Sequence, residues 1–387
     1  MSADEKNRLT HITGTFLIQA EGAFLNGAGL DTGEDRNAVI PKTYADGRNR
    51  VPYVSAQAWR RWLRLTFQDE NPNEPATELR ALSFNAKGNP DKIGTEMNPI
   101  EFAEDDIFGY MRAEKGQGRT KEVDADDADA DEGAEVETAP DAAPVKGKKK
   151  TEKTKAVMRP SPFVSSILRS IRNNGWQGDD EGFVHLKTGS PLPYKTKFYN
   201  TQLQGVFGLN YARLGVFRND GDRIELAEDL VKKYEAEKVL RTNGNPNIYE
   251  VAENKRRERA AMILRALAVL RGGAKQAQFG TDVAPKAIII AGLNCGNLIF
   301  NDLFEEREGQ PAIKLSALKE TIDDYRQRIT TPVFIGVRDG YLHPQNESEL
   351  RSWVEGSAQV NGGNFDVRLA SPLRAVEALT EQLEEVG

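Results

Sequence analysis

Apolar residues recur along the chain at two spacings, one typical of strands and one typical of helices. From Ile12 to Ala20, apolar and small side chains occupy every second position, which predicts a half-buried strand within 12–24. In 56–67, Trp59 and Trp62 belong to one apolar stripe at helical spacing, and Ser55 before them is a good N-cap. We therefore expect a helix there, anchored to the core by both tryptophans, whose replacement should unfold the protein.

The same patterns predict alternating strands and helices through the rest of the chain. We expect strands at 51–54, 196–217, 287–291 and 333–337, a loop at 26–35, a glycine- and proline-rich excursion at 173–193, and helices at 162–171, 250–270 and 313–328, with a final helix opened by Ser371-Pro372. This alternation favours an α+β or α/β fold. The chain shows no internal repeat, which argues against a solenoid.

The composition changes sharply at 113–158. The stretch has no aromatic residue, and ten acidic residues within 122–141 are followed by six lysines within 146–155. Such a segment cannot bury enough apolar surface to offset the entropy of ordering it, so we expect a disordered insertion in a loop. It divides the chain into 1–112, 113–158 and 159–387.

Cysteine and histidine usage narrows the chemistry. A single cysteine, Cys295, excludes a disulfide framework and a multi-cysteine metal site. The histidines, His11, His185 and His343, are too scattered for a zinc site. We also see no secretory signal and no apolar run long enough for a membrane span. These features predict a cytoplasmic protein with no membrane association, metal or cofactor.

The formal net charge of −7 does not exclude a polyanionic partner. Most of that charge belongs to the insertion, which leaves the remainder of the chain nearly neutral. Local basic patches then decide whether a nucleic acid can bind.

The most informative basic segment is 55–64. Ser55 and Gln57 begin the expected helix, whose first amides and positive dipole end suit a phosphate. Arg60, Arg61 and Arg64 follow within three turns and could contact neighbouring phosphates. The alternative is a solvated arginine face opposite the tryptophan stripe.

A second candidate is the turn at 272–276, where a long helix ends in two glycines. Lys275 and Gln276 follow them and could contact a phosphate or a 2′-hydroxyl group. The alternative is an ordinary glycine C-cap with exposed polar residues. The spacing does not match a phosphate-binding P-loop.

Two further segments allow two interpretations each. Residues 194–199 interleave Lys195 and Lys197 with aromatic residues, as single-strand binders do, but a strand with exposed lysines explains the pattern as well. The glycine-rich segment 26–36 carries Asp31 and Asp35, which could hold a metal or act as a general acid, or could belong to a simple turn.

Together, the motifs resemble a known family. The helix motif at 55–64 follows the Asn26 loop and a basic stretch containing Lys42. Downstream come Asp106-Ile-Phe-Gly-Tyr, Phe198-Tyr-Asn-Thr-Gln-Leu-Gln-Gly-Val-Phe and Gly273-Ala-Lys-Gln, in that order. This combination resembles the backbone subunit of the CRISPR Cascade surveillance complex, the seventh family of CRISPR-associated proteins, and most closely its DevR-like branch of type I-B systems.

The resemblance implies an α+β fold with an RNA-recognition-motif-like (ferredoxin-like) palm and finger and thumb insertions. The insertion at 113–158 would lie in the finger region, and 173–199 is the candidate thumb. It implies a non-catalytic subunit whose partners are a CRISPR guide RNA, target DNA through that guide, other copies of itself and other Cascade subunits. The residues that match its RNA-binding positions are Asn26, Lys42, Ser55, Gln57, Arg60, Arg61, Arg64, Lys275 and Gln276.

Two other functions remain open. Related subunits of type III complexes cut target RNA with an aspartate in the first glycine-rich loop, where Asp31 and Asp35 fall. The other possibility is a sequence-blind RNA-binding protein outside CRISPR immunity. Such a protein would bind RNA as isolated monomers, whereas a filament subunit would bind with length-dependent cooperativity.

Overall fold

The computed structural model describes residues 8–32, 36, 38–78, 80–84, 90–112, 157–172, 178–221, 224–242 and 244–385. The chain divides into two compact units, each assembled from separate stretches of sequence. Unit 1 comprises Met1–Asn73, Phe163–Ala212 and Arg256–Gly387, and unit 2 comprises Glu74–Pro162 and Arg213–Lys255. Nearly all of the predicted insertion at 113–158 lies outside the described residues.

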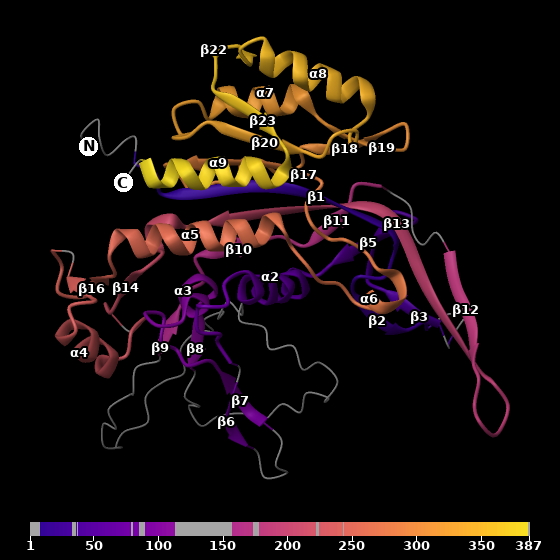
Figure 1. Ribbon diagram of the computed structural model, residues 1–387, viewed down its shortest axis with the longest axis horizontal. Helices are drawn as coiled ribbons and strands as arrows, with labels where there is room; N and C mark the ends of the chain where they lie inside the picture. Colours follow the sequence, from indigo (N-terminus) through magenta and orange to yellow (C-terminus); the bar gives the residue numbers. More distant parts are fainter. Residues whose placement is uncertain are drawn as a thin grey trace, which may run out of the picture. The chain divides into compact units, whose positions relative to one another are not determined.

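Unit 1 is built on a large, mostly antiparallel sheet (Figure 1). The strands follow the spatial order β23-β20-β17-β1-β13-β11-β5-β4, and β10, β12, β3 and β2 pair beside this path. Among the described strands of this sheet, only β20 with β23 and β13 with β3 pair in parallel. The strands of this sheet are β1 (His11–Ala23), β2 (Gly27–Leu30), β3 (Ala38–Pro41), β4 (Thr43–Asp46), β5 (Asn49–Val54), β10 (Phe163–Ser165), β11 (Leu168–Ser170), β12 (Gly178–Val184), β13 (Leu192–Leu209), β17 (Ala287–Leu293), β20 (Val333–Val337) and β23 (Val367–Ala370).

The other elements of unit 1 are helices and two short hairpins. They are α2 (Ala56–Glu70), the 3₁₀ turn η1 (Tyr211–Arg213) at the boundary with unit 2, α5 (Glu253–Ala268), which begins in unit 2, α6 (Gln276–Phe279), β18 (Phe304–Arg307) with β19 (Gln310–Ile313), α7 (Leu315–Asp324), α8 (Pro344–Glu355), β21 (Gln359–Val360) with β22 (Gly363–Asn364), and α9 (Pro372–Glu385).

The central strand β1 is buried on both faces, whereas the alternation in its sequence predicted burial on only one. It lies between β17 and β13 and is buried without interruption from Ile12 to Ile18. The hydroxyl groups of Thr13 and Thr15 are buried too, and they donate to backbone carbonyls of β13 at 3.3 and 3.0 Å. Polar side chains can therefore occupy this strand because the neighbouring strand satisfies them.

Helices cover both faces of the sheet (Figure 1). On one face, the Trp59 ring of α2 packs edge-on against Phe16, with ring centroids 5.4 Å apart. The beginning of α9 lies close to Gly336 on the same face, and Arg265 of α5 donates to Thr380 of α9 at 3.4 Å. On the opposite face, α7 and α8 bury apolar side chains in one cluster with Leu17.

A long hairpin of β12 and β13 continues the sheet beyond its core (Figure 1). The pairing runs from Gly178 opposite Phe198 to Val184 opposite Leu192. The part of β13 that pairs with β1 is buried, whereas most of the hairpin is half-buried or exposed. This hairpin occupies most of the candidate thumb at 173–199, whose first five residues lie outside the described residues.

Unit 2 is smaller and has its own apolar cluster, to which Phe217, Leu226 and Tyr234 contribute. Its described residues form two two-stranded sheets (β6 with β7, and β8 with β9), a three-stranded sheet in the order β14-β16-β15, and two helices. Its elements are β6 (Arg80–Phe84), β7 (Pro90–Gly94), α3 (Ala103–Phe108), β8 (Tyr110–Arg112), β9 (Val157–Arg159), β14 (Val216–Arg218), α4 (Glu228–Ala236), β15 (Arg241–Thr242) and β16 (Ile248–Glu250).

The structure confirms an α+β fold and most of the predicted elements, but two segments were assigned the wrong secondary structure. Residues 162–171 form β10 and β11 instead of a helix, because Phe163 pairs with Leu209 of β13 and Leu168 pairs with Val54 of β5. Ladders with distant strands outweigh the local helical pattern. The predicted loop at 26–35 contains β2, which pairs with β3.

Within the described ranges, no helix is long and apolar enough to cross a membrane.

Candidate nucleic-acid interface

Three segments that are far apart in sequence meet around residues 24–26. The side-chain Oδ1 of Asn26 accepts a hydrogen bond from the Ser55 amide at 3.1 Å, and the Asn26 carbonyl accepts one from the Lys42 amide at 2.8 Å. On the other side of this stretch, the amide of Ala274 donates to the Leu25 carbonyl at 2.9 Å. The structure therefore brings Asn26, Lys42, Ser55 and the turn before Lys275 together.

Ser55 caps α2 as its sequence context predicts. Its Oγ accepts a hydrogen bond from the Ala58 amide at 3.3 Å. Among the described residues, the amides of Ala56 and Gln57 have no acceptor, and the Gln57 side chain is exposed. The first turn of α2 thus presents two amides and the positive end of the helix dipole, which together favour an anion.

The three arginines of α2 have different surroundings. Arg60 is tied to its own protein, because its guanidinium donates to the Phe163 carbonyl at 2.8 Å and lies 5.8 Å from the Phe163 ring centroid. Arg61 is exposed, and Arg64 is half-buried. Since Gln57, Arg61 and Arg64 are spaced by four and three residues, they lie along one face of the helix.

The turn at 272–276 is locked by contacts with its neighbours. Lys275 has a positive φ of 51°, and its Nζ donates to Thr196 Oγ1 at 2.8 Å while lying 5.4 Å from the centroid of the Phe24 ring. The Gln276 side chain donates to the Gly272 carbonyl. Gly272 and Gly273 have φ of 153° and 107°, a backbone region that favours glycine, so the glycines are needed for the turn itself.

The two hairpin lysines are ion-paired. Lys195 Nζ lies 2.8 Å from carboxylate oxygens of both Asp179 and Glu181 on the facing strand β12. Lys197 Nζ lies 3.0 Å from Asp31 Oδ2, and both partners are largely buried. The alternative of a strand with exposed lysines therefore does not describe Lys197, and both lysines are at least partly neutralised by their own chain.

The aspartates of the glycine-rich segment do not form a carboxylate cluster in the described part of the chain. Asp31 pairs with Lys197, and Asp35 lies outside the described residues. No group of three or more histidine, cysteine, aspartate or glutamate side chains gathers at a metal-binding distance within the parts of the chain that the structure describes. Cys295 is a free, half-buried thiol.

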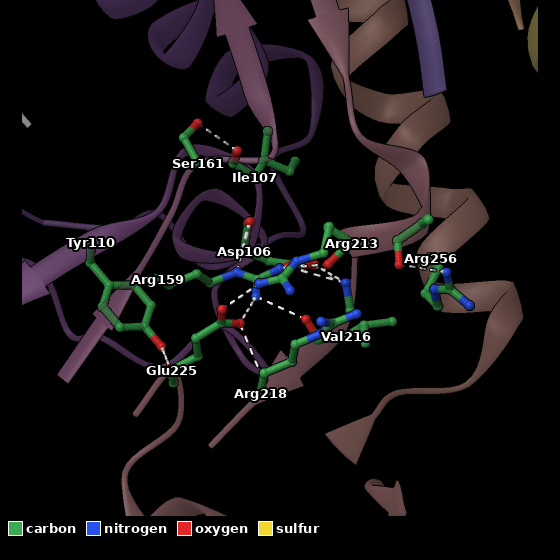
Figure 2. A network of polar contacts seen from close by, with 12 residues as sticks. Asp106, Ile107, Tyr110, Arg159, Ser161, Arg213, Val216, Arg218, Glu225 and Arg256 are labelled. Atoms are coloured by element: carbon green, nitrogen blue, oxygen red, sulfur yellow. Dashed lines mark hydrogen bonds and ion pairs between the residues drawn. The ribbon is translucent and has the colours of Figure 1, made fainter. Parts of the chain in front are cut away.

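The motif at 106–110 lies in unit 2, within a buried network of charged side chains (Figure 2). Arg159 bonds to the carboxylates of Asp106 and Glu225, and its guanidinium lies 4.6 Å from the Phe217 ring centroid. Asp106 also accepts two hydrogen bonds from the Gly215 amide, at 2.9 and 3.1 Å.

Two neighbours complete this network. Arg213 forms a second ion pair with Glu225. Burial raises the pKa of the Tyr110 phenol, which donates to the Glu225 carbonyl and stays neutral. Asp106 thus serves the internal structure of unit 2.

Two residues next to the candidate interface were missed by the sequence interpretation. Thr196 and Phe24 hold the Lys275 ammonium, although Thr196 is 79 residues away from Lys275 in the chain. Both are buried, at 1% and 2% exposure. In the sequence, the one indication of either residue is its position next to a candidate. Phe24 lies two residues before Asn26, and Thr196 lies between Lys195 and Lys197.

Comparisons with known proteins indicate the fold. No family model matches the chain, and no curated protein matches it in sequence. A chain of a solved structure titled "CRISPR RNA-guided surveillance complex, pre-nicking" aligns with 97% of this chain and 100% of its own length, at a TM-score of 0.52 and 10% sequence identity. A chain titled "CRISPR RNA-guided surveillance complex" aligns over 96% and 99% of the two lengths at 11% identity, with a TM-score of 0.45 that is too low to support an argument. The first likeness shows that nearly the whole chain shares its fold with a component of such a complex.

Proposed function

We propose that this chain is a guide-RNA-binding backbone subunit of a CRISPR effector complex of type I, closest to type I-B systems and their DevR-like proteins. Several copies line up along one guide RNA in the cytoplasm, beside other Cascade subunits, and hold the RNA open for pairing with target DNA. The observation that carries the proposal is the meeting of Asn26, Ser55 and the Lys275 turn around 24–26. These motifs carry the resemblance to the CRISPR backbone subunits, and they converge within a fold shared with a surveillance-complex chain.

The connectivity of the central strands supports a ferredoxin-like palm. The order β17-β1-β13-β11 is antiparallel, with α2 between β1 and β11 in the chain and α5 between β13 and β17. This is the order of a β-α-β-β-α-β unit. We assign the palm to these elements, the thumb to the β12–β13 hairpin, and the finger to the region of the insertion at 113–158.

The candidate contacts suit recognition of a nucleic-acid backbone. The amides of Ala56 and Gln57, the exposed Arg61 and the Lys275 ammonium are groups that bind phosphates or 2′-hydroxyls. Such contacts carry no base preference, so a subunit that uses them accepts any guide sequence and leaves the base edges free for pairing.

The subunit is proposed to be non-catalytic. The pairing of Asp31 with Lys197 supports this, because a carboxylate neutralised by a lysine is a poor ligand for a catalytic metal ion. The test is incubation of the purified protein and labelled single-stranded RNA with Mg²⁺ or Mn²⁺. We expect intact RNA, whereas cleavage that disappears in Asp31→Ala or in Asp35→Ala would establish a target-RNA-cleaving subunit instead.

The decisive experiment is co-expression of the chain with a CRISPR array and its neighbouring genes, followed by purification at moderate salt. We expect co-purified RNA, visible in the ratio of absorbance at 260 and 280 nm, and a ladder of regularly spaced protected fragments after nuclease treatment. A nucleic-acid-free monomer under these conditions would contradict the proposal. Binding of any RNA by isolated monomers, without cooperativity, would indicate an RNA-binding protein outside CRISPR immunity.

Matched variants separate loss of RNA from loss of fold. Arg61→Ala removes an exposed arginine of the proposed interface, and Arg374→Ala removes an exposed arginine of α9, where its only described ion pair is with Glu377. We expect less co-purified RNA with Arg61→Ala and no change with Arg374→Ala. Equal RNA content in the two variants would refute the assignment of α2 to the interface.

A further inference from the structure

The Lys275 ammonium is held by neutral groups. Its Nζ donates to the Thr196 hydroxyl at 2.8 Å and lies 5.4 Å from the centroid of the Phe24 ring, whose face attracts a cation. Within the described residues, no carboxylate forms an ion pair with it. The side chain is therefore fixed in place by neutral groups, without an ion pair among the described residues.

The backbone that carries Lys275 is fixed as well. Lys275 adopts the left-handed region at φ 51°, where an ordinary residue stays only if its surroundings hold it there. The surroundings include the hydrogen bond from Ala274 to the Leu25 carbonyl and the bond from the Gln276 side chain to the Gly272 carbonyl. Strained backbone and an oriented cation in one turn are typical of a preorganised binding position.

We propose that Thr196 and Phe24 position the Lys275 ammonium to receive one phosphate of an RNA backbone. This inference rests on the proposed function, since it assumes that RNA passes the Lys275 turn. Thr196 and Phe24 are buried, at 1% and 2% exposure, so they do not touch the RNA and act only through Lys275. They are positioning residues.

Neutral partners are required for this role. A carboxylate in place of the Thr196 hydroxyl would orient the lysine equally well, but it would cancel the charge that attracts the phosphate. Lys197, the residue after Thr196 in β13, is an example of a lysine oriented by a carboxylate, because its Nζ lies 3.0 Å from Asp31 Oδ2. The hydroxyl group and the aromatic ring hold the Lys275 side chain before RNA binds, so that binding costs less side-chain entropy. Because both groups are neutral, they do not weaken the attraction between the ammonium and a phosphate.

The test is Thr196→Val, which removes the hydroxyl and keeps a β-branched side chain. The matched control is Thr201→Val, which removes a buried hydroxyl of the same strand that contacts Ser170 instead.

Affinity of the full chain for a fluorescent single-stranded RNA is measured by anisotropy at several salt concentrations. Lys275→Ala should make the negative slope of log K against log salt less steep by about 0.7, the value for one phosphate contact on single strands. We expect Thr196→Val to lower affinity several-fold and to reduce the slope in the same direction, and Thr201→Val to leave the slope unchanged.

A double variant separates positioning from a structural role. In Thr196→Val with Lys275→Ala, we expect the RNA affinity of Lys275→Ala alone, because Thr196 acts only through the lysine. Additive losses would overturn the proposal. Phe24→Leu provides an independent variant in case Thr196→Val fails to fold, with the same expected change in slope.

The outcomes distinguish this inference from the proposed function. If the wild-type chain binds RNA and Thr196→Val behaves like Thr201→Val, the positioning role is refuted and the function stands. If the wild-type chain, loaded or reconstituted with its neighbouring subunits, binds no RNA, the proposed function is refuted and the inference falls with it.

Discussion

Arg159 in unit 2 and Lys275 in unit 1 are both held in fixed positions, but by opposite kinds of partner. Arg159 is fully buried and bonded to the carboxylates of Asp106 and Glu225, as Figure 2 shows. Lys275 is only half-buried and is held by a hydroxyl group and an aromatic ring. The first cation is ion-paired with carboxylates of its own chain, whereas the second has no ion pair among the described residues.

The difference teaches which basic residues can serve a ligand. A buried guanidinium must be matched by carboxylates, because removing an unpaired charge from water costs several kcal/mol. Once matched, it holds the fold together and is closed to other anions. A cation at the surface that is fixed by neutral groups has the reverse property. The groups that bond to each lysine or arginine, more than the number of these residues, therefore indicate which of them belong to the candidate interface.

The largest expected effect comes from breaking the buried network. Arg159→Met takes the guanidinium away from the buried carboxylate of Asp106 and leaves Glu225 with its ion pair to Arg213. We expect a loss of about 3–5 kcal/mol in the free energy of unfolding unit 2. Hydrogen exchange of unit 2 peptides under increasing urea measures it. Arg374→Ala, a control whose arginine side chain is 76% exposed, should cost at most about 1 kcal/mol. Equal effects of the two variants would contradict the structural role of Arg159.

The second-largest effect is expected from Trp59→Phe. Its comparison with Arg61→Ala tests whether the aromatic side chains, and not the arginines of α2, hold unit 1 together. Trp59 is fully buried, and its Nε1 donates to the Ser166 carbonyl at 2.7 Å. Trp59→Phe leaves that carbonyl unsatisfied, and we expect a loss of about 1–3 kcal/mol in urea-induced unfolding. Arg61→Ala should change stability by no more than about 0.5 kcal/mol. A destabilising Arg61→Ala would mean that the exposed arginine also supports the fold.

The third effect concerns binding. Arg61→Ala should weaken binding of single-stranded RNA about tenfold, the equivalent of one charge-assisted hydrogen bond of about 1.5 kcal/mol. Arg60→Ala should mix weaker binding with lower stability, because Arg60 also donates to the Phe163 carbonyl. Titrations by anisotropy, with thermal unfolding of each variant, separate the two. Unchanged affinity in a folded Arg61→Ala protein would remove Arg61 from the interface.

The smallest effect is expected from removing a neutralised cation together with its partner. Asp31→Leu with Lys197→Met deletes the ion pair, so the local charge stays the same. We expect RNA affinity to remain at the wild-type level, whereas Lys275→Met alone should reduce it. A loss in the double variant as large as that in Lys275→Met would show that paired lysines also contact RNA, and the distinction drawn from Arg159 and Lys275 would fail.

Elements with strong local patterns were predictable from the sequence. The apolar stripe around Trp59 and the N-cap Ser55 correctly located α2, and the alternation from Ile12 located β1. The apolar run at 287–291 correctly located β17. In each case the pattern reflects burial of one element against the core, and nearby residues carry that information.

Elements that depend on distant pairing were not predictable. Residues 162–171 look helical in isolation, yet Phe163 and Leu168 complete ladders with β13 and β5. The same distinction between local and distant information applies to the residues of the candidate interface. Ser55 could be recognised as a cap from its neighbours, whereas the contact of Lys275 with Thr196 joins residues 79 positions apart. The proposed RNA contacts of all these residues stay predictions.

By itself, the sequence pattern narrowed the fold to α+β or α/β, and it gave the positions of most main helices and strands and the basic segments that could face a nucleic acid. Only the tertiary structure decided which of those basic residues form ion pairs with carboxylates of their own chain. In the sequence, Lys195, Lys197 and Lys275 are equally good candidates for contacting a nucleic acid. In the fold, Lys195 pairs with a carboxylate of the facing strand and Lys197 pairs with Asp31, next to β2. Lys275 instead bonds to a hydroxyl group of β13. The physical reason is that a side chain's charge is inherent to the residue, whereas its compensation depends on groups that folding brings within a few ångströms.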